Sequence, residues 1–436
     1  MARVAAQGAR LSAVRWATQH AVAETLGLPR VEEDDLDEAL ERLAEAQEHM
    51  EAALYRRTVR QRGGAPTVVW YDVTSAYLEG DQHERAAFGA SRAQKPRKAQ
   101  LVMGLLSTAE GEPVAVHVDA GNPSDPVTVP EQVHTLQSRF GITAVVFVGD
   151  RGMVNAQGKP PLTAAGFRSI TALTPPQVRR LLQTQVLRAE WLTTHVHEVV
   201  HGAVRLILRR SDALRQPAAR RRADKWATRQ RLITARHAFG ETATRTKPDT
   251  GLRTLQAWVT RHKLAAFGPV SWHDGRLRAT LDPAAQAEAT VLDGGSVLET
   301  DVPQTALDAQ AVHDRSRDRY EGEQDFRTMT TGLLAGRPIL VRHAPRPRAH
   351  VFVTMLAFKG VRELRRALVA AFGTTADDKM AVTVEEALLA LARLWLLTYH
   401  IQGTAVTRLP TTDDRPTAIL AALGTPLPPS RSLRHM

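Results

Sequence analysis

The sequence predicts an α/β fold with a mixed β-sheet at its core and helical regions at the two ends of the chain. Two apolar runs carry this prediction, residues 68–71 (VVWY) and 144–149 (AVVFVG). Their β-branched and aromatic residues at consecutive positions favour strands that are buried on both faces. Each run leads directly into an aspartate, Asp72 or Asp150. The third observation is the strand-like pattern between these runs, which is flanked by segments with helical spacing.

Composition narrows the class of protein. With 436 residues, the chain can bury a large core and form two or three domains. The absence of cysteine excludes disulfides, thiolate zinc sites and cysteine nucleophiles. No apolar run is long enough to span a bilayer and no signal-peptide pattern is present, so we expect a cytoplasmic protein without a membrane partner. A formal charge of +11 favours a polyanionic partner, most simply nucleic acid.

The N-terminal region, residues 1–62, is predicted to be helical and is a candidate DNA contact. Residues 11–28 have apolar positions at helical spacing, and residues 33–60 form a longer pattern of the same kind. Asp34 or Asp35 is placed to cap the second helix.

Three strands and a helix are predicted to follow. Residues 67–77 form the first strand, and residues 101–106 and 113–118 continue it as an antiparallel meander. A helix through residue 140 then leads to the strand that ends at Asp150, which we expect beside the first strand. This order, with acids on the first and fourth strands, matches the ribonuclease-H-like (retroviral-integrase-like) fold. We assign residues 63–166 to its first part.

The two aspartates form a candidate metal site. A buried acid is costly unless it is paired or holds a metal ion, and Mg²⁺ prefers oxygen ligands such as carboxylates. Asp72 and Asp150 therefore indicate two carboxylates that converge at the sheet. The alternative for Asp72 is that it ends its strand and caps the next turn.

Residues 167–312 are predicted to form a mixed, largely β insertion. A strand is expected at 169–173, a helix at 177–187, and hairpins at 270–281 and 289–300, the last around the turn 293–295. Within it, residues 209–231 carry nine arginines or lysines against two aspartates, with Trp226 among them. A nucleic-acid-facing surface and a solvated basic helix both explain this composition.

One motif in the insertion has two interpretations. Residues 197–201 (HEVVH) satisfy the H-E-x-x-H pattern, which on a helix would place two imidazoles on one face for zinc. The surrounding residues favour a strand, on which Glu198 would point away from His197 and His201. A zinc protease is therefore the less favoured alternative.

Residues 313–360 are predicted to complete the core with a helix that carries Glu323. Phe326 and Met329 can line its inward stripe, and Arg319 and Arg327 lie one turn to either side of Glu323. An ordinary surface helix with ion pairs is the alternative. Residues 361–436 are predicted to form a helical C-terminal region.

That region contains a strong amphipathic pattern at 384–400, which predicts one helix that packs on the core or on a partner subunit. The tail after Pro426 is expected to be disordered.

Several segments in order resemble a known family. They are residues 71–74 (YDVT), 121–125 (GNPSD), 148–152 (VGDRG), 292–295 (LDGG), 299–301 (ETD), 323–327 (EQDFR), 337–338 (RP) and 349–350 (AH). On these segments the chain resembles a DDE transposase of a bacterial insertion sequence, in the insertion-sequence-four superfamily. The resemblance runs from about residue 36 past residue 400.

The resemblance implies a catalytic triad of Asp72, Asp150 and Glu323 that holds two Mg²⁺ ions, for which Mn²⁺ can substitute. It implies that the enzyme cuts element ends in double-stranded DNA and joins them to target DNA, as a nucleoid-associated homodimer. Hairpin formation and base flipping against an aromatic residue are further implications, with Trp191, Trp226, Trp258 and Trp272 as candidates for the aromatic. The expected DNA contacts are Arg319, Arg327, Arg151 and Arg337.

Two residues depart from the family's signature around the glutamate, Tyr-x2-Arg-x3-Glu-x6-Lys. Arg319 and Glu323 fit it, whereas Ser316 stands at the tyrosine position and Thr330 at the lysine position. Both family residues help to hold DNA, so their absence makes a catalytically weakened or inactive DNA-binding relic one alternative. A nuclease of the same fold without strand transfer is another alternative.

Overall fold

The structure, a computed structural model, describes most of the 436 residues. The residues outside its description are 1, 6–9, 23–25, 29–30, 80–82, 84–85, 89–97, 120–124, 243–247, 262–269, 274–275, 280–281, 331–332, 335, 337–338, 342, 344, 377–378, 396, 402–403, 409–413, 427–430 and 435–436. The chain divides into two compact units: Met1–Phe167 with Asp318–Met436, and Arg168–Arg317.

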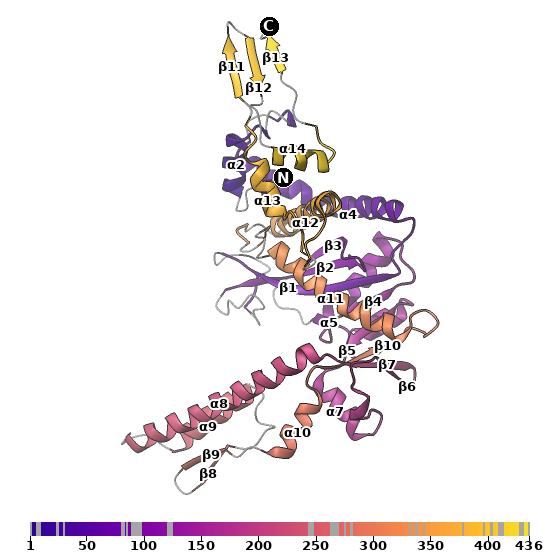
Figure 1. Ribbon diagram of the computed structural model, residues 1–436, viewed down its shortest axis with the longest axis vertical. Coiled ribbons are helices and arrows are strands. Elements are labelled where there is room, and N and C mark those ends of the chain that lie inside the picture. Colours follow the sequence, from indigo (N-terminus) through magenta and orange to yellow (C-terminus); the bar gives the residue numbers. More distant parts are fainter. Residues whose placement is uncertain are drawn as a thin grey trace. The chain divides into compact units, whose positions relative to one another are not determined.

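The sheet of the first unit contains β1 (Val68–Tyr77), β2 (Gln100–Thr108), β3 (Pro113–Asp119) and β4 (Val146–Gly149), in the order β3-β2-β1-β4 (Figure 1). β1 pairs antiparallel with β2, β2 pairs antiparallel with β3, and β4 runs parallel to β1. The predicted meander and the return of the fourth strand beside the first are both confirmed.

Separate hydrophobic cores cover the two faces of this sheet. Tyr71 and Val73 belong to the core that includes the helix pair α5 (Asp125–His134) and η1 (Thr135–Arg139). Ala76 belongs to the opposite core, which α12 (Pro345–Phe372) supplies with a row of apolar side chains. β1 is therefore buried on both faces, as its uninterrupted apolar run predicts.

The long helix α4 (Glu33–Arg62) covers the edge strand β3. Gln47 and Glu51, one turn apart on α4, bond the backbone of Val116. The Gln47 amide donates to the Val116 carbonyl (2.9 Å), and the Val116 N–H donates to the Glu51 carboxylate (3.2 Å). An open strand edge would leave these groups unpaired, so the helix occupies the place of a further strand.

The start of α4 corrects one expectation. Its N-cap is Glu32, and Asp35 is the third helical residue, whose carboxylate accepts the Glu32 N–H at 2.8 Å. Before it lie α1 (Ala2–Ala5) and α2 (Arg10–Gln19), so the helix expected over 11–28 ends at Gln19.

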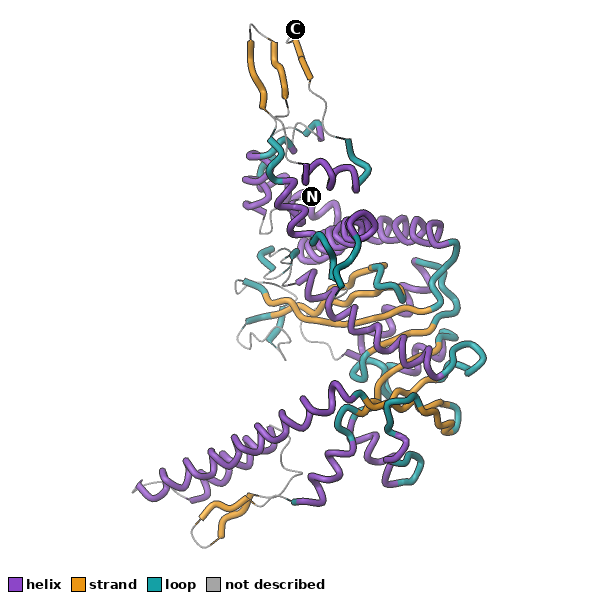
Figure 2. The backbone as a smooth tube through the Cα atoms, in the orientation of Figure 1, coloured by secondary structure: helices purple, strands orange, loops and turns teal. Residues whose placement is uncertain are grey.

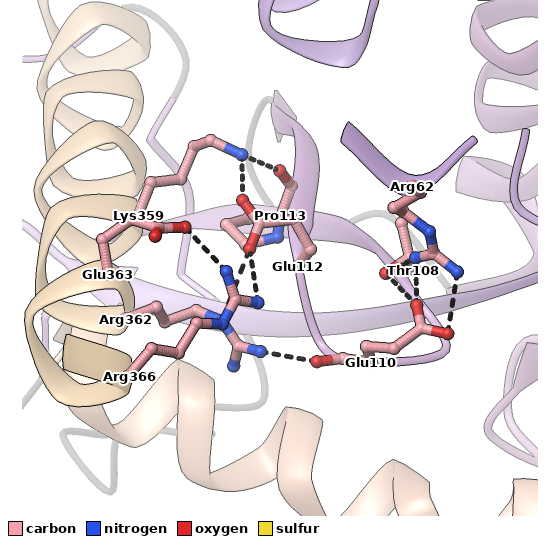
Figure 3. A network of polar contacts seen from close by, with 9 residues as sticks. All are labelled: Arg62, Thr108, Glu110, Glu112, Pro113, Lys359, Arg362, Glu363 and Arg366. Atoms are coloured by element: carbon pink, nitrogen blue, oxygen red, sulfur yellow. Dashed lines mark hydrogen bonds and ion pairs between the residues drawn. The ribbon is translucent and has the colours of Figure 1, made fainter. Parts of the chain in front are cut away.

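Ion pairs fix α12 to the turn between β2 and β3. The carboxylate of Glu112 is buried and pairs with Lys359 and, at 3.3 Å, with Arg366 (Figure 3). Lys359 also donates to the Pro113 carbonyl at 3.1 Å, and Arg362 donates to the Glu110 carbonyl. α12 is thus held by directional contacts as well as by its apolar face.

In the second unit, β5 (Arg168–Ala172), β10 (Gly295–Thr300), β7 (Val204–Arg210) and β6 (His197–His201) pair in that order, all antiparallel. The helix expected at 177–187 is α7 (Pro175–Gln183), which begins earlier because Thr174 and Gln177 form a capping box. Leu206, Leu208 and Val297 form the core of this unit with residues of α7.

The same unit contains a helical hairpin that corrects the expectation of a largely β insertion. α8 (Asp212–Thr242) is a single helix of 31 residues, and α9 (Pro248–Arg261) packs beside it (Figure 2). The hairpin expected at 270–281 is confirmed as β8 (Val270–His273) and β9 (Arg276–Ala279). The hairpin expected at 289–300 is wrong, because α10 (Pro283–Val291) precedes β10 there.

The remaining elements belong to α11 (Ala309–Thr330) and the C-terminal region. The single helix expected at 384–400 is wrong: α13 (Val384–Leu391) is short, and residues 397–401 form β11 (Leu397–Ile401). β11 pairs with β12 (Thr404–Arg408), which pairs with β13 (Arg431–Arg434). β13 lies in the tail that was expected to be disordered, after α14 (Asp414–Ala422). Within the described residues, no helix is both long and apolar enough to cross a membrane.

Candidate active site

Asp72 lies on β1, and Asp150 directly follows the neighbouring strand β4. The parallel register of the two strands pairs Tyr71 with Gly149, and the aspartates are the next residues along the chain. Neighbouring strands are about 4.8 Å apart, so the backbones at these two positions lie close together. Both side chains are half-buried. Asp72 lies within β1 and not at its end, so the alternative that it caps the next turn is wrong.

Close packing fixes the strands at this point. A Cβ atom on Gly104 of β2 would meet the Tyr71 hydroxyl oxygen at 2.5 Å, so only glycine leaves room for that ring. After β4 the chain turns sharply, with the Asp150 carbonyl accepting the Met153 and Val154 N–H groups. The Arg151 N–H donates to the Asp150 carboxylate at 2.8 Å, which orients this side chain.

Asp72 lies on the face of β1 that α11 helps to cover. Alternate strand residues share a face, which places Asp72 with Trp70 and Ala76. Ala76 packs in the same core as Met329, near the end of α11. The inward position expected for Met329 is thus confirmed, and α11 lies over the side of the sheet that carries Asp72.

Glu323 belongs to this helix, although its side chain lies outside the description. Thr330, seven residues later and so on nearly the same helical stripe, is buried.

The structure describes the side chains of two of the four residues predicted to contact DNA. Arg151 and Arg327 are exposed, Arg151 directly after Asp150 and Arg327 on α11. Arg319 is on α11 with its side chain outside the description, and Arg337 lies outside it altogether.

A second group of ligand-type side chains was missed in the sequence. His117 and Asp119 on β3 and Glu131 on α5 each offer a ligand atom, and these atoms lie within 4.8 Å of one another. The sequence feature that could have revealed this group is the His-x-Asp spacing at the end of a strand, because alternate residues of a strand share a face. Trp70 was also missed: its buried indole N–H has no hydrogen-bond partner in the described part of the chain, and it shares the Asp72 face.

The H-E-x-x-H segment is a strand, as expected. It forms β6, where Glu198 accepts two hydrogen bonds from Arg205 (2.8 and 3.0 Å). His197 stacks on Trp191 with ring centroids 5.0 Å apart. Among the other candidate aromatics, Trp226 lies 4.6 Å from the Arg229 guanidinium, Trp258 is half-buried on α9, and the Trp272 side chain lies outside the description.

Comparison with known proteins gives one family. The model of the transposase DDE domain matches residues 63–342. No curated protein matches the chain. Among solved structures, the piggyBac transposase synaptic complex with hairpin DNA is similar, with 10% sequence identity and a TM-score of 0.26. The similarity covers 76% of this chain and 63% of the piggyBac chain.

Proposed function

The chain belongs to the transposase DDE domain family, and we propose that it cuts the ends of an insertion sequence and joins them to target DNA. The observation that supports this proposal is the register of β1 and β4, which pairs the residues immediately before Asp72 and Asp150. A ribonuclease-H-like core of the insertion-sequence-four type is part of the proposal, and the strand order β3-β2-β1-β4 supports it.

The residues present fit divalent cations of the Mg²⁺ type. Asp72 and Asp150 offer only oxygen donors, from strands about 4.8 Å apart, which suits a hard cation. Glu323 would complete the set from α11. When bound, two Mg²⁺ or Mn²⁺ ions supply an activated water and charge stabilisation for the leaving 3′ oxygen.

The chain's own residues would hold and orient the reacting groups. The Arg151 N–H donates to Asp150 Oδ1 and so helps to orient this carboxylate for a ligand. Arg151 and Arg327, both exposed, would contact the DNA backbone on either side of the triad. In strand transfer the freed 3′-OH attacks a target phosphorus, and the target's own 3′ oxygen leaves. No covalent link to the protein is needed.

The test uses purified full-length protein, a donor DNA with the sequences that border its reading frame, and a supercoiled target plasmid. With Mg²⁺ we expect nicking at the ends and joined products. Asp72→Asn and Asp150→Asn should each lower cleavage by about 100-fold or more, because each removes a metal ligand worth several kcal/mol in the transition state. DNA binding in a gel-shift assay should be retained.

Asp414→Asn is the matched control, because Asp414 is exposed at the start of α14 and far along the chain from the triad. Cleavage that survives Asp72→Asn would refute the proposed site.

A relic that binds DNA without cutting it is the second candidate function. It is favoured by Thr330, which is buried where the family has a DNA-contacting lysine. Retained binding with no cleavage at any Mg²⁺ or Mn²⁺ concentration would select the relic. Cleavage without joined products would select a nuclease that lacks strand transfer.

A further inference from the structure

We propose that His117, Asp119 and Glu131 form a second cation site, selective for Zn²⁺-like or Mn²⁺-like metals over Mg²⁺. The His117 Nε2 atom lies 3.0 Å from Asp119 Oδ1 and 3.1 Å from Glu131 Oε2. Ligand atoms bound at about 2.1 Å around a tetrahedral ion are about 3.4 Å apart. The three side chains thus need only small shifts to hold an ion.

The backbone fixes two of the ligands in advance. His117 and Asp119 are alternate residues of β3 and so project from the same face of the sheet. Glu131 comes from α5, the helix that packs on this face. The site therefore joins a strand to a helix, and an ion there would fix α5 against β3.

The burial of the group points to a missing partner. His117 and Asp119 are 26% and 20% exposed, and Glu131 is 52% exposed. Asp119 Oδ2 has no accessible surface and no hydrogen-bond partner among the described residues. A buried carboxylate oxygen is costly to leave unsatisfied, and an ion would satisfy it. The exposed side at Glu131 leaves room for water to complete the coordination.

A proton is the competitor for this position. Burial lowers the pKa of His117, but hydrogen bonds and charge from Asp119 and Glu131 outweigh it and raise the pKa to about 9. The same two carboxylates that favour the imidazolium would favour a divalent cation once that proton leaves. The pKa of Glu131 is lowered mainly by its hydrogen bond with His117, and less by the charges of Arg139 and Arg348. Both arginines are also bonded to acids or amides of α4.

The ligand atoms of this site differ from those of the triad of Asp72, Asp150 and Glu323, because one of them is a nitrogen. An imidazole nitrogen suits Zn²⁺, Mn²⁺ or Co²⁺, whereas Mg²⁺ prefers oxygen ligands. The two sites also lie on opposite faces of the sheet: His117 is in register with Gly104 and so with Val73, the residue after Asp72. The inference therefore does not rest on the proposed function.

The test measures Zn²⁺ binding to metal-free full-length protein by calorimetry, with excess Mg²⁺ present, together with the midpoint of thermal unfolding. Wild type and Asp150→Asn should both bind one Zn²⁺ and gain thermal stability from it. His117→Gln and Glu131→Gln should each lose affinity by tenfold or more and lose the stability gain. Co²⁺ should give a visible absorption band in wild type that His117→Gln lacks.

His134→Gln is the matched control, an exposed histidine further along α5. Because Glu131 is half-exposed, Glu131→Gln keeps the test valid if His117→Gln fails to fold. Equal Zn²⁺ affinity in wild type and in Glu131→Gln would overturn the proposal, as would loss of binding in His134→Gln.

Discussion

The burial of Thr330 determines how a lysine at this position would affect stability and DNA binding. Thr330 is 3% exposed at the end of α11, next to Met329 in the core. A lysine would have to bury an ammonium group, which is costly without a paired carboxylate. We expect Thr330→Lys to lower the free energy of unfolding by about 2–3 kcal/mol and to leave DNA affinity unchanged. Urea unfolding and gel-shift titration measure the two effects.

Arg327→Gln is the comparison variant, because Arg327 is exposed on the same helix. It should weaken DNA binding and leave the urea midpoint unchanged. A Thr330→Lys variant that binds DNA more tightly without loss of stability would show that position 330 faces the DNA.

At the residue scale, the sequence shows which side chains could act in chemistry better than it shows how buried they are or which side chains surround them. The two apolar runs were sufficient to predict that the strand with Asp72 and the strand before Asp150 are neighbours, because both runs have the pattern of strands buried on both faces. The sequence does not predict that Thr330 is buried, because a mostly polar helix has few apolar residues to mark its buried face. The grouping of Glu131 with His117 was also hidden, because it depends on how α5 lies across β3.

At the scale of elements, the buried Glu112 holds α12 to the β2–β3 turn through Lys359 and Arg366 (Figure 3). Glu112→Gln removes the negative charge but keeps an acceptor, so it leaves three cations, Lys359, Arg362 and Arg366, with a weaker partner. We expect a loss of about 1–3 kcal/mol in the free energy of unfolding. Chemical denaturation measures it.

Glu363→Gln is the matched control for Glu112→Gln, because Glu363 pairs with Arg366 but is 67% exposed. It should change stability by no more than about 0.5 kcal/mol. Equal effects of the two variants would show that the network does not anchor α12.

The capping box of α13 makes a pH-dependent prediction. Glu386 accepts the Thr383 N–H at 3.0 Å, and this backbone hydrogen bond is the main cause that lowers the pKa of Glu386 below 4.5. A lowered pKa in the folded state means that the stabilisation is present above about pH 4.5 and is lost as pH falls through the folded pKa. Wild type should therefore lose stability relative to Glu386→Gln on acidification below pH 4.5. Thermal unfolding at a series of pH values measures the difference, and parallel curves would contradict it.

Elements were predictable where local pattern and tertiary pairing agree. The β1–β2–β3 meander follows from its apolar runs and turn, and the structure has it. Residues 384–400 have helical spacing throughout, yet residues 397–401 (LTYHI) are β-branched and aromatic enough to pair with β12. The hairpin predicted at 289–300 is a second error, since its first residues continue the alanine-rich helix α10, which ends at Val291. In each case a distant pairing or a propensity outweighed the periodicity.

At the scale of the whole molecule, the charge of +11 raises the question of where DNA is held. α8 is a candidate because Arg220, Arg221 and Lys225 are exposed on it. Two other basic residues of α8 are held by protein groups: Arg222 donates to Asp293 at 2.6 Å, and Arg229 is buried over Trp226. Arg221 donates its Nε–H to the Pro217 carbonyl at 3.2 Å, but its side chain remains exposed. The exposed residues Arg220, Arg221 and Lys225 are the ones that can contact phosphates. Substituting them can therefore distinguish a nucleic-acid-facing surface from a solvated basic helix.

Each phosphate contact contributes about 0.9 to the slope of log affinity against log salt concentration. If α8 contacts the DNA backbone, replacing Arg220 and Arg221 by glutamine should reduce the magnitude of that slope by about 1.8 and weaken binding to all sequences alike. The charge-matched control replaces Arg365 and Arg393, which are exposed on α12 and just after α13. A reduction in both double variants would indicate a general effect of net charge. A reduction in neither would make α8 a solvated scaffold helix, and one confined to the Arg220 and Arg221 pair would place DNA on α8.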